Sequence, residues 1–136
     1  MSRTISDKTR KLVAERAGFC CEYCRTHQSD LLLGCQIDHI ISLKHGGSNS
    51  NQNLAFSCFV CNSFKGSDIG TVHPKSQFTR FFNPRTDNWQ DHFRLLGSLI
   101  LSKTKVGEGT LRILQFNARD RVARREHLIL MGRYPA

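Results

Sequence analysis

Two Cys-x-x-Cys pairs constrain the fold of this chain more than any other feature of its sequence. The first pair is Cys21 and Cys24, the second is Cys58 and Cys61, and 33 residues lie between the pairs. Each pair brings two thiolates to the spacing that one tetrahedral ion needs, so two pairs complete a four-thiolate zinc site. Redox-active or merely buried free cysteines are the alternative. We therefore expect one structural Zn²⁺ ion that joins two distant parts of the chain.

The chain has six cysteines in all, and Cys20 and Cys35 fall outside both pairs. We expect each of these two to be a small buried apolar residue. The first six residues hold no apolar segment of the kind that a secretory signal requires. A cytoplasmic location is therefore expected, where cysteines more often serve metal binding or catalysis than a disulfide framework.

The charge of the chain points to a polyanionic partner. Its 136 residues, about the length of one domain, include 20 Lys and Arg against 11 Asp and Glu, a formal net charge of +9. Such an excess suits nucleic acid or an anionic membrane surface. The apolar runs are far shorter than the ~20 residues of a membrane span, and no strongly amphipathic helix carries exposed aromatic residues. Nucleic acid is thus the expected partner, and membrane association is not expected.

The basic residues are unevenly distributed. Residues 77–136 hold 11 Lys and Arg against 5 Asp and Glu, whereas residues 36–76 hold 3 against 2. We interpret the middle of the chain as the chemical centre and the flanks as the electrostatic contact with nucleic acid. Four arginines within seven residues favour phosphate contact about as much as a merely solvated helix face; they are Arg119, Arg121, Arg124 and Arg125.

The first half of the chain predicts a helix followed by strand, loop, strand and helix. Ser6 is a suitable N-cap for the first helix, and Gly18 ends it. The later elements are expected as a strand over 36–41, a loop over 46–51, a strand over 54–56 and a helix from Asn62 to about Ile69.

The second half predicts a different arrangement. Its aromatic residues Phe81, Phe82, Trp89 and Phe93 are expected in the core. The expected elements are a turn at 83–85, a β-hairpin over 93–101, a break at Gly107-Glu108-Gly109, a short helix over 110–115, and a final helix over 118–131 capped by Asn117, with Val122, Leu128 and Ile129 on its apolar side.

A series of short motifs lies between the two cysteine pairs and beyond the second. Asp38-His39 is followed by Gly46-Gly47, by Asn53-Leu54 and by Cys58-Phe59-Val60-Cys61-Asn62-Ser63-Phe64-Lys65-Gly66. Over residues 18–68 the chain resembles the HNH endonucleases, or ββα-metal nucleases, and Cys21-Glu22-Tyr23-Cys24 is similar to their zinc-bearing subgroup. The tail from Phe82-Asn83-Pro84-Arg85 onward resembles that of a bacterial, often cyanobacterial, HNH subgroup.

The resemblance implies an α+β fold. Its centre would be a ββα-metal (His-Me finger) core stapled by the structural zinc, with an N-terminal helix and a C-terminal extension of a hairpin plus a helix. The implied organisation is a single domain over 1–136, with the nuclease core at 18–70 and the extension at 77–136 packing on that core.

The resemblance also implies the roles of particular residues. His39 would be the general base, for which its ordinary pKa is suitable, and Asn53 would pin the loop and so fix the His39 ring. Asp38 and Asn62 would hold the catalytic divalent metal. Many relatives have His at the last motif position, and an all-oxygen pair suits Mg²⁺ or Mn²⁺. Lys65 is expected to contact phosphate or, with equal weight, to be solvated.

Two functions from different classes follow. The leading one is a metal-dependent DNA endonuclease that hydrolyses phosphodiester bonds and leaves 5′-phosphate and 3′-hydroxyl ends. The alternative is a zinc-stapled nucleic-acid-binding module without catalysis, which would need the four cysteines and the charge but not His39. Neither function involves a small-molecule substrate, and both leave the target sequence and the oligomeric state open.

Overall fold

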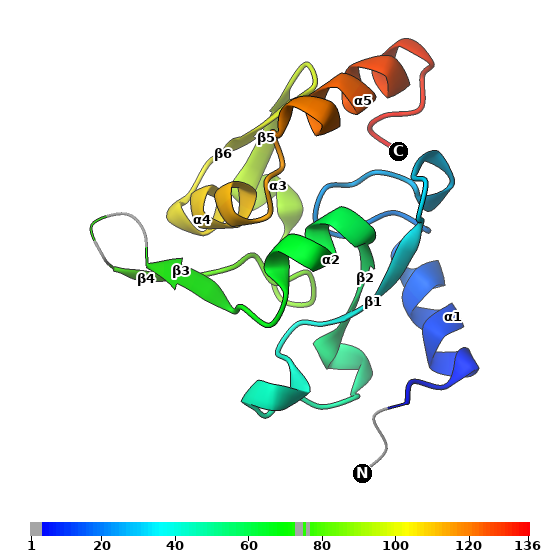
Figure 1. Cartoon of the computed structure of the whole chain (residues 1–136), viewed down its shortest axis with the longest axis vertical. Helices are drawn as coiled ribbons and strands as arrows, with labels where there is room; N and C mark the ends of the chain where they lie inside the picture. The colour runs from blue at the N-terminus through cyan, green and yellow to red at the C-terminus, as the bar shows by residue number, and fades with distance from the viewer. Residues whose placement is uncertain (1–3, 73–74, 76) are drawn as a thin grey trace.

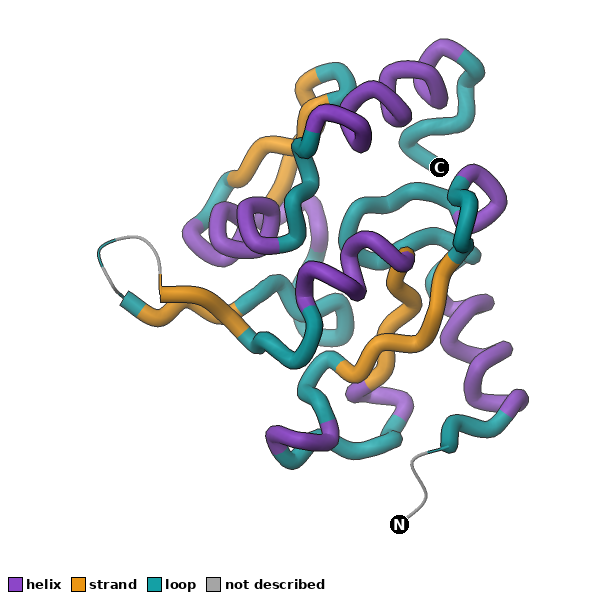
Figure 2. Tube along the Cα trace, in the orientation of Figure 1, coloured by secondary structure: helices purple, strands orange, loops and turns teal. Residues whose placement is uncertain are grey.

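Short helices and three two-stranded antiparallel sheets make up the α+β fold of the computed structural model, which describes residues 4–72, 75 and 77–136. Figure 1 shows the β1–β2 hairpin and α2 between α1 on one side and the C-terminal elements on the other, and Figure 2 shows how much of the chain is loop. The elements are α1 (Asp7–Arg16), β1 (Cys35–His39), β2 (Leu54–Cys58), α2 (Phe59–Lys65), β3 (Gly70–Val72), β4 (Phe78–Arg80), α3 (Trp89–His92), β5 (Phe93–Leu96), β6 (Leu99–Ser102), α4 (Lys105–Ile113) and α5 (Arg119–Leu130), with 3₁₀ turns at Gln28–Asp30, Leu43–His45 and Asn51–Asn53.

The N-terminal helix is confirmed. The Ser6 hydroxyl accepts a hydrogen bond from the Thr9 amide at 3.2 Å, which caps α1 as predicted. Beyond Arg16 the chain turns at Gly18, whose φ of +62° suits a glycine. The buried Val13 packs with Leu54 and Phe56 of β2 in a small apolar cluster. This cluster fixes α1 against the β1–β2 hairpin.

The strand–strand–helix unit is present over residues 35–65. β1 pairs with β2 from Cys35 opposite Cys58 to His39 opposite Leu54. The helix start predicted at Asn62 is wrong, because α2 begins at Phe59. The sulfur of Cys58 accepts a hydrogen bond from the Cys61 amide at 3.3 Å and so caps the helix. The second cysteine pair therefore spans the junction from β2 to α2.

In the C-terminal half the predicted β-hairpin is present, but the predicted break is not. β5 and β6 pair from Phe93 opposite Ser102 to Leu96 opposite Leu99. The break expected at 107–109 is wrong, since these residues lie inside α4, which Thr104 caps. A Cβ at Gly107 would lie 2.2 Å from the His92 carbonyl oxygen. The glycine thus allows close packing of a helix and does not end one.

The final helix is present, but its expected cap is not, and of its expected apolar side only Leu128 is buried. Ala118 is the N-cap of α5, and the Asn117 side chain instead bonds both backbone groups of Ile100, in β6. The buried face of α5 consists of Arg121, Arg125 and Leu128. This spacing of four and three residues is that of one helix face. Val122 is only partly buried and Ile129 is exposed.

The main core joins the two halves of the chain. Tyr23 and Ile40 from the first half lie in one buried cluster with the four expected core aromatics, Phe81, Phe82, Trp89 and Phe93. The Trp89 indole N–H donates to the Tyr23 carbonyl oxygen at 2.8 Å. We retain as a proposal the division into a nuclease core at 18–70 and an extension at 77–136 within one domain. Among the described residues, no helix combines the length and apolarity needed to cross a bilayer.

Candidate metal centre and active site

The four cysteines of the two pairs form one buried cluster. Their sulfur atoms all lie within 4.8 Å of one another, and the sulfurs of Cys24 and Cys58 are 3.8 Å apart. Four sulfurs bound ~2.3 Å from one tetrahedral ion lie roughly 3.8 Å apart. The amide of the second cysteine in each pair also approaches the sulfur of the first, at 3.5 Å for Cys24 to Cys21 and 3.3 Å for Cys61 to Cys58. The donor set therefore fits a structural zinc ion.

The four thiols of this cluster differ in their electrostatics, because burial raises the pKa of Cys21 and of Cys61 well above the ordinary value. Hydrogen bonds from the other three thiols hold the pKa of Cys24 well below its ordinary value. The guanidinium of Arg121 lies 3.0 Å from the Cys61 sulfur and 3.7 Å from the Cys58 sulfur. Burial by itself lowers the pKa of Arg121, but the neighbouring cysteine sulfurs outweigh it and raise that pKa. Zinc binds cysteine as the thiolate, and the positive charge of Arg121 beside the sulfurs favours that form.

Cys20 and Cys35 correct the expectation that they are buried. Both side chains are only partly buried. Each lies at the edge of an element, since Cys20 makes an isolated bridge with His27 and Cys35 is the first residue of β1. Burial nevertheless raises the pKa of each thiol, which disfavours the reactive thiolate form, and both cysteines lie outside the metal cluster.

Asp38 and Lys65 form an ion pair inside the protein. The Lys65 ammonium lies 3.2 Å from Oδ2 of Asp38, and the two side chains are 4% exposed for Asp38 and 2% for Lys65. The Tyr23 hydroxyl donates to the same oxygen at 2.9 Å. Burial raises the pKa of Asp38 above its ordinary value, although Lys65 and Tyr23 oppose this effect. Lys65 is thus neither solvated nor presented to phosphate, contrary to both expectations.

His39 ends β1 with an oriented ring. Its Nε2 lies 2.8 Å from Oδ1 of Asn49. Because an amide oxygen only accepts hydrogen bonds, Nε2 is the donor in this pair, and Nδ1 of the neutral ring is left to take up a proton. Asn49 is a residue of the candidate site that the sequence does not predict. Nothing in the pattern Ser48-Asn49-Ser50-Asn51 distinguishes its two asparagines.

Asn53 closes the loop that carries Asn49. Its Oδ1 accepts from the Ile41 amide at 2.9 Å, and its Nδ2 donates to the carbonyl oxygens of Ile41 and Ser48, each at 2.8 Å. The loop passes close to its own start, since a Cβ at Gly47 would lie 1.7 Å from the Ile41 oxygen. Asn53 therefore bonds the loop and not the His39 ring, whereas Asn49 contacts the ring directly.

The oxygen donors expected for a second metal come from two elements. Asn62 lies on α2 three residues before Lys65, so the two side chains share one face of the helix. On this face Lys65 contacts Asp38 and the His39 carbonyl oxygen. The Asp38 carboxylate, however, already binds the Lys65 ammonium, and a divalent ion there would take the place of that ammonium. Among the described residues, the four-cysteine cluster is the one group of three or more His, Cys, Asp or Glu side chains placed to hold a metal.

The four arginines of α5 divide into two kinds. Arg119 and Arg124 are exposed. Arg125 is buried, and donates to the Ser98 carbonyl oxygen at 2.7 Å and to the Asn117 Oδ1 at 2.9 Å. Arg121 is buried against the cysteine sulfurs. The expected phosphate contact is therefore wrong for Arg121 and Arg125, which lie on the helix face turned to the core.

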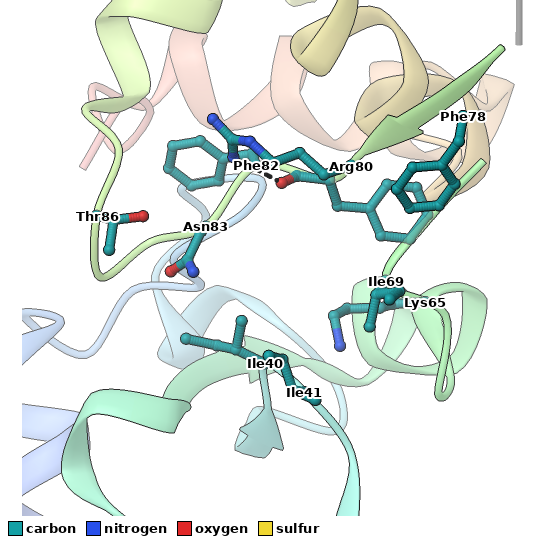
Figure 3. Close-up of a pocket in the computed structure, with 10 residues that line it drawn as sticks. Ile40, Ile41, Lys65, Ile69, Phe78, Arg80, Phe82, Asn83 and Thr86 are labelled. Carbon is teal, nitrogen blue, oxygen red and sulfur yellow. Dashed lines mark hydrogen bonds between the residues drawn. The ribbon is translucent and has the colours of Figure 1, made fainter. Parts of the chain in front are cut away.

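A cavity of about 260 Å³ lies beside the end of β1. Figure 3 shows Ile40 and Ile41 on one side of this cavity and Phe78 and Arg80 on the other. Its lining is mostly apolar. Lys65 contributes to the cavity wall as well as to the ion pair with Asp38, so the cavity adjoins the candidate active site.

One of the comparisons with known proteins agrees with this arrangement. Residues 21–68 match the family model described as HNH endonuclease. This segment contains both cysteine pairs, the ββα unit and the Asp38-His39 dipeptide. Over these residues the chain is therefore similar to the HNH endonuclease family, and its cysteine cluster matches that of the zinc-bearing subgroup. No curated protein and no solved structure matched the chain.

Proposed function

We propose that this protein is a metal-dependent DNA endonuclease that hydrolyses phosphodiester bonds. The observation that carries the proposal is the His39 ring, which lies within the family-matched segment and is held by Asn49 with Nδ1 left as the basic nitrogen. Imidazole accepts protons near neutral pH, which suits a general base for water. The HNH domain itself indicates nuclease or nucleic-acid-binding function.

The division of roles in the proposed reaction follows from the contacts. His39 removes a proton from the attacking water at Nδ1, while Asn49 and Asn53 hold the ring and its loop in position. Mg²⁺ or Mn²⁺, when bound through Asp38 and Asn62, would supply a Lewis acid for the phosphate. That binding requires the Lys65 ammonium to leave Asp38. The structural zinc takes no part in the chemistry.

The substrate class is proposed from charge. A net charge of +9 suits a DNA partner. Of the predicted arginine cluster, Arg119 and Arg124 have exposed side chains on α5. We propose that these two contact DNA phosphates, whereas Arg121 and Arg125 stabilise the fold.

A nicking assay on supercoiled plasmid tests the proposal. We expect zinc-loaded wild type to nick DNA when Mg²⁺ or Mn²⁺ is added, and His39→Ala to be slower by about 10²–10⁴-fold, the usual contribution of a general base. His45→Ala is the matched control, because His45 is an exposed histidine in the 3₁₀ turn that follows β1. The metal is omitted rather than chelated, since a chelator would also remove the zinc. Equal nicking by wild type and His39→Ala would overturn the proposal.

A second candidate is a DNA-binding module without catalysis. The observation that favours it is the buried Lys65 ammonium, which occupies the Asp38 carboxylate that a catalytic metal would need. This candidate predicts that wild type shifts DNA in a gel but nicks no plasmid at any Mg²⁺ or Mn²⁺ concentration. Nicking that His39→Ala abolishes would exclude it.

A further inference from the structure

We propose that Arg121 belongs to the zinc centre, where it neutralises the thiolate charge and ties α5 to the metal. This inference rests on the structural zinc inferred above. The contact that carries it is the approach of the Arg121 Nη2 to the sulfurs of Cys61 and Cys58, at 3.0 and 3.7 Å. Both sulfurs belong to the second cysteine pair, whereas Arg121 lies 60 residues beyond Cys61 on another element.

Charge explains why an arginine lies here. Four thiolates around Zn²⁺ leave a net charge of −2, and a buried charge of that kind is costly unless it is paired and hydrogen-bonded. Arg121 is itself only 8% exposed, so its cation needs an anion equally. Its planar guanidinium also allows several bonds at once, because Nη1 donates to the Leu114 and Gln115 carbonyl oxygens at 2.8 and 3.2 Å. One side chain thus joins the sulfurs to the chain segment before α5.

Other contacts from the C-terminal region converge on the same cysteine pairs. The Tyr134 hydroxyl donates to the Cys24 carbonyl oxygen at 2.9 Å, and the Trp89 indole donates to the Tyr23 carbonyl oxygen at 2.8 Å. The C-terminal extension therefore contacts backbone carbonyl oxygens within the first cysteine pair and the sulfur atoms of the second pair. Among these contacts, the one through Arg121 depends on the charge of the metal centre, so zinc occupancy and the position of α5 are coupled.

The test compares Arg121→Met and Arg121→Lys with wild type and with Arg124→Met. Arg124 lies on the same helix but is exposed, so it controls for loss of one positive charge. Zinc affinity is measured by competition with a chromogenic chelator, and the thiolate surroundings are read from the charge-transfer absorption of the Co²⁺-substituted proteins. Hydrogen exchange of α5 is measured with and without zinc.

We expect Arg121→Met to weaken zinc affinity about 10–100-fold, as loss of an outer-shell partner does. Its charge-transfer band moves to lower energy, because the thiolates lose a hydrogen-bond donor, and α5 exchanges faster. Arg121→Lys keeps the positive charge, so its zinc affinity falls between those of wild type and Arg121→Met. It replaces Arg121→Met in the measurements if that variant does not fold. Arg124→Met matches wild type in zinc affinity, in its charge-transfer band and in the hydrogen exchange of α5.

Two outcomes would overturn the inference while leaving the zinc proposal in place. If wild type binds one zinc ion but both Arg121 variants keep its affinity and its charge-transfer band, the arginine is no part of the centre. The arginine is equally excluded if Arg124→Met weakens zinc binding as much as Arg121→Met. If wild type binds neither Zn²⁺ nor Co²⁺, the zinc proposal itself fails and the inference fails with it.

Discussion

The ammonium group of Lys65 and the carboxylate of Asp38 lie 3.2 Å apart with almost no exposure to solvent. Lys65 also donates to the His39 carbonyl oxygen at 3.1 Å, so it joins α2 to the end of β1 at the residues proposed for catalysis. Removing either charge would leave the other buried and unpaired. The pair therefore contributes to the fold as well as to the site.

The first prediction concerns this ion pair. We expect Asp38→Ala to lower the free energy of unfolding by about 3–5 kcal/mol, because it leaves a buried lysine uncompensated. The double variant Asp38→Leu with Lys65→Met should recover most of that loss, since apolar side chains can replace a buried pair. Urea unfolding of the three proteins measures both effects. A single variant as stable as wild type would show that the pair is not buried in solution.

The second prediction concerns Asn49. We expect Asn49→Ala to slow nicking by about 10–100-fold, because the ring of His39 loses the bond that orients it. Its stability should change little, since Asn49 lies in a loop. Asn51→Ala is the control, because it changes an exposed asparagine of the same loop. Equal rates for these two variants would mean that the bond from His39 to Asn49 does not position the base.

The third prediction separates the arginines of α5. Replacing Arg119 and Arg124 by alanine should weaken DNA binding and reduce the slope of log affinity against log salt by about 0.9 for each phosphate that is no longer neutralised. Arg125→Ala should instead lower the free energy of unfolding by roughly 1–3 kcal/mol, because the Ser98 carbonyl oxygen and the Asn117 Oδ1 each lose the hydrogen bond that the buried Arg125 donates. Salt-dependent DNA titrations and urea unfolding of each variant test this division of the arginines. A large loss of stability in the variant that lacks Arg119 and Arg124 would contradict it.

The fourth prediction concerns Gly107. Helix propensity alone predicts that Gly→Ala inside α4 stabilises by about 1 kcal/mol. We expect the opposite sign, a loss of about 1–3 kcal/mol, because the new Cβ would lie 2.2 Å from the His92 carbonyl oxygen. Lys105→Ala, at an exposed position of the same helix, should have little effect. A stabilised Gly107→Ala variant would show that α4 does not pack this closely on α3.

Local patterns in the sequence were sufficient for several elements of the fold. The cap at Ser6, the β5–β6 hairpin and the grouping of the two cysteine pairs each depend on residues near one another in the chain or on a spacing that one ion imposes. The same holds for Asn53, whose amide bonds the backbone on both sides of its loop.

The predictions were wrong where a contact with a residue distant in the sequence decides the local structure. Helix propensity treats Gly107 as a break, but packing against His92 makes it a helix residue. A cluster of arginines predicts a phosphate surface, yet Arg121 and Arg125 lie on the inner face of α5, where they bond sulfurs and carbonyl oxygens.

The sequence by itself determined the chemistry that the chain carries: four cysteines at zinc spacing, one histidine beside one aspartate, and an excess of positive charge. Only the tertiary structure decided which groups meet. It paired Lys65 with Asp38, Asn49 with His39 and Arg121 with the cysteine sulfurs. The physical reason is that a buried charge or polar group must find a partner in space, and that partner's distance along the chain leaves no local signal in the sequence.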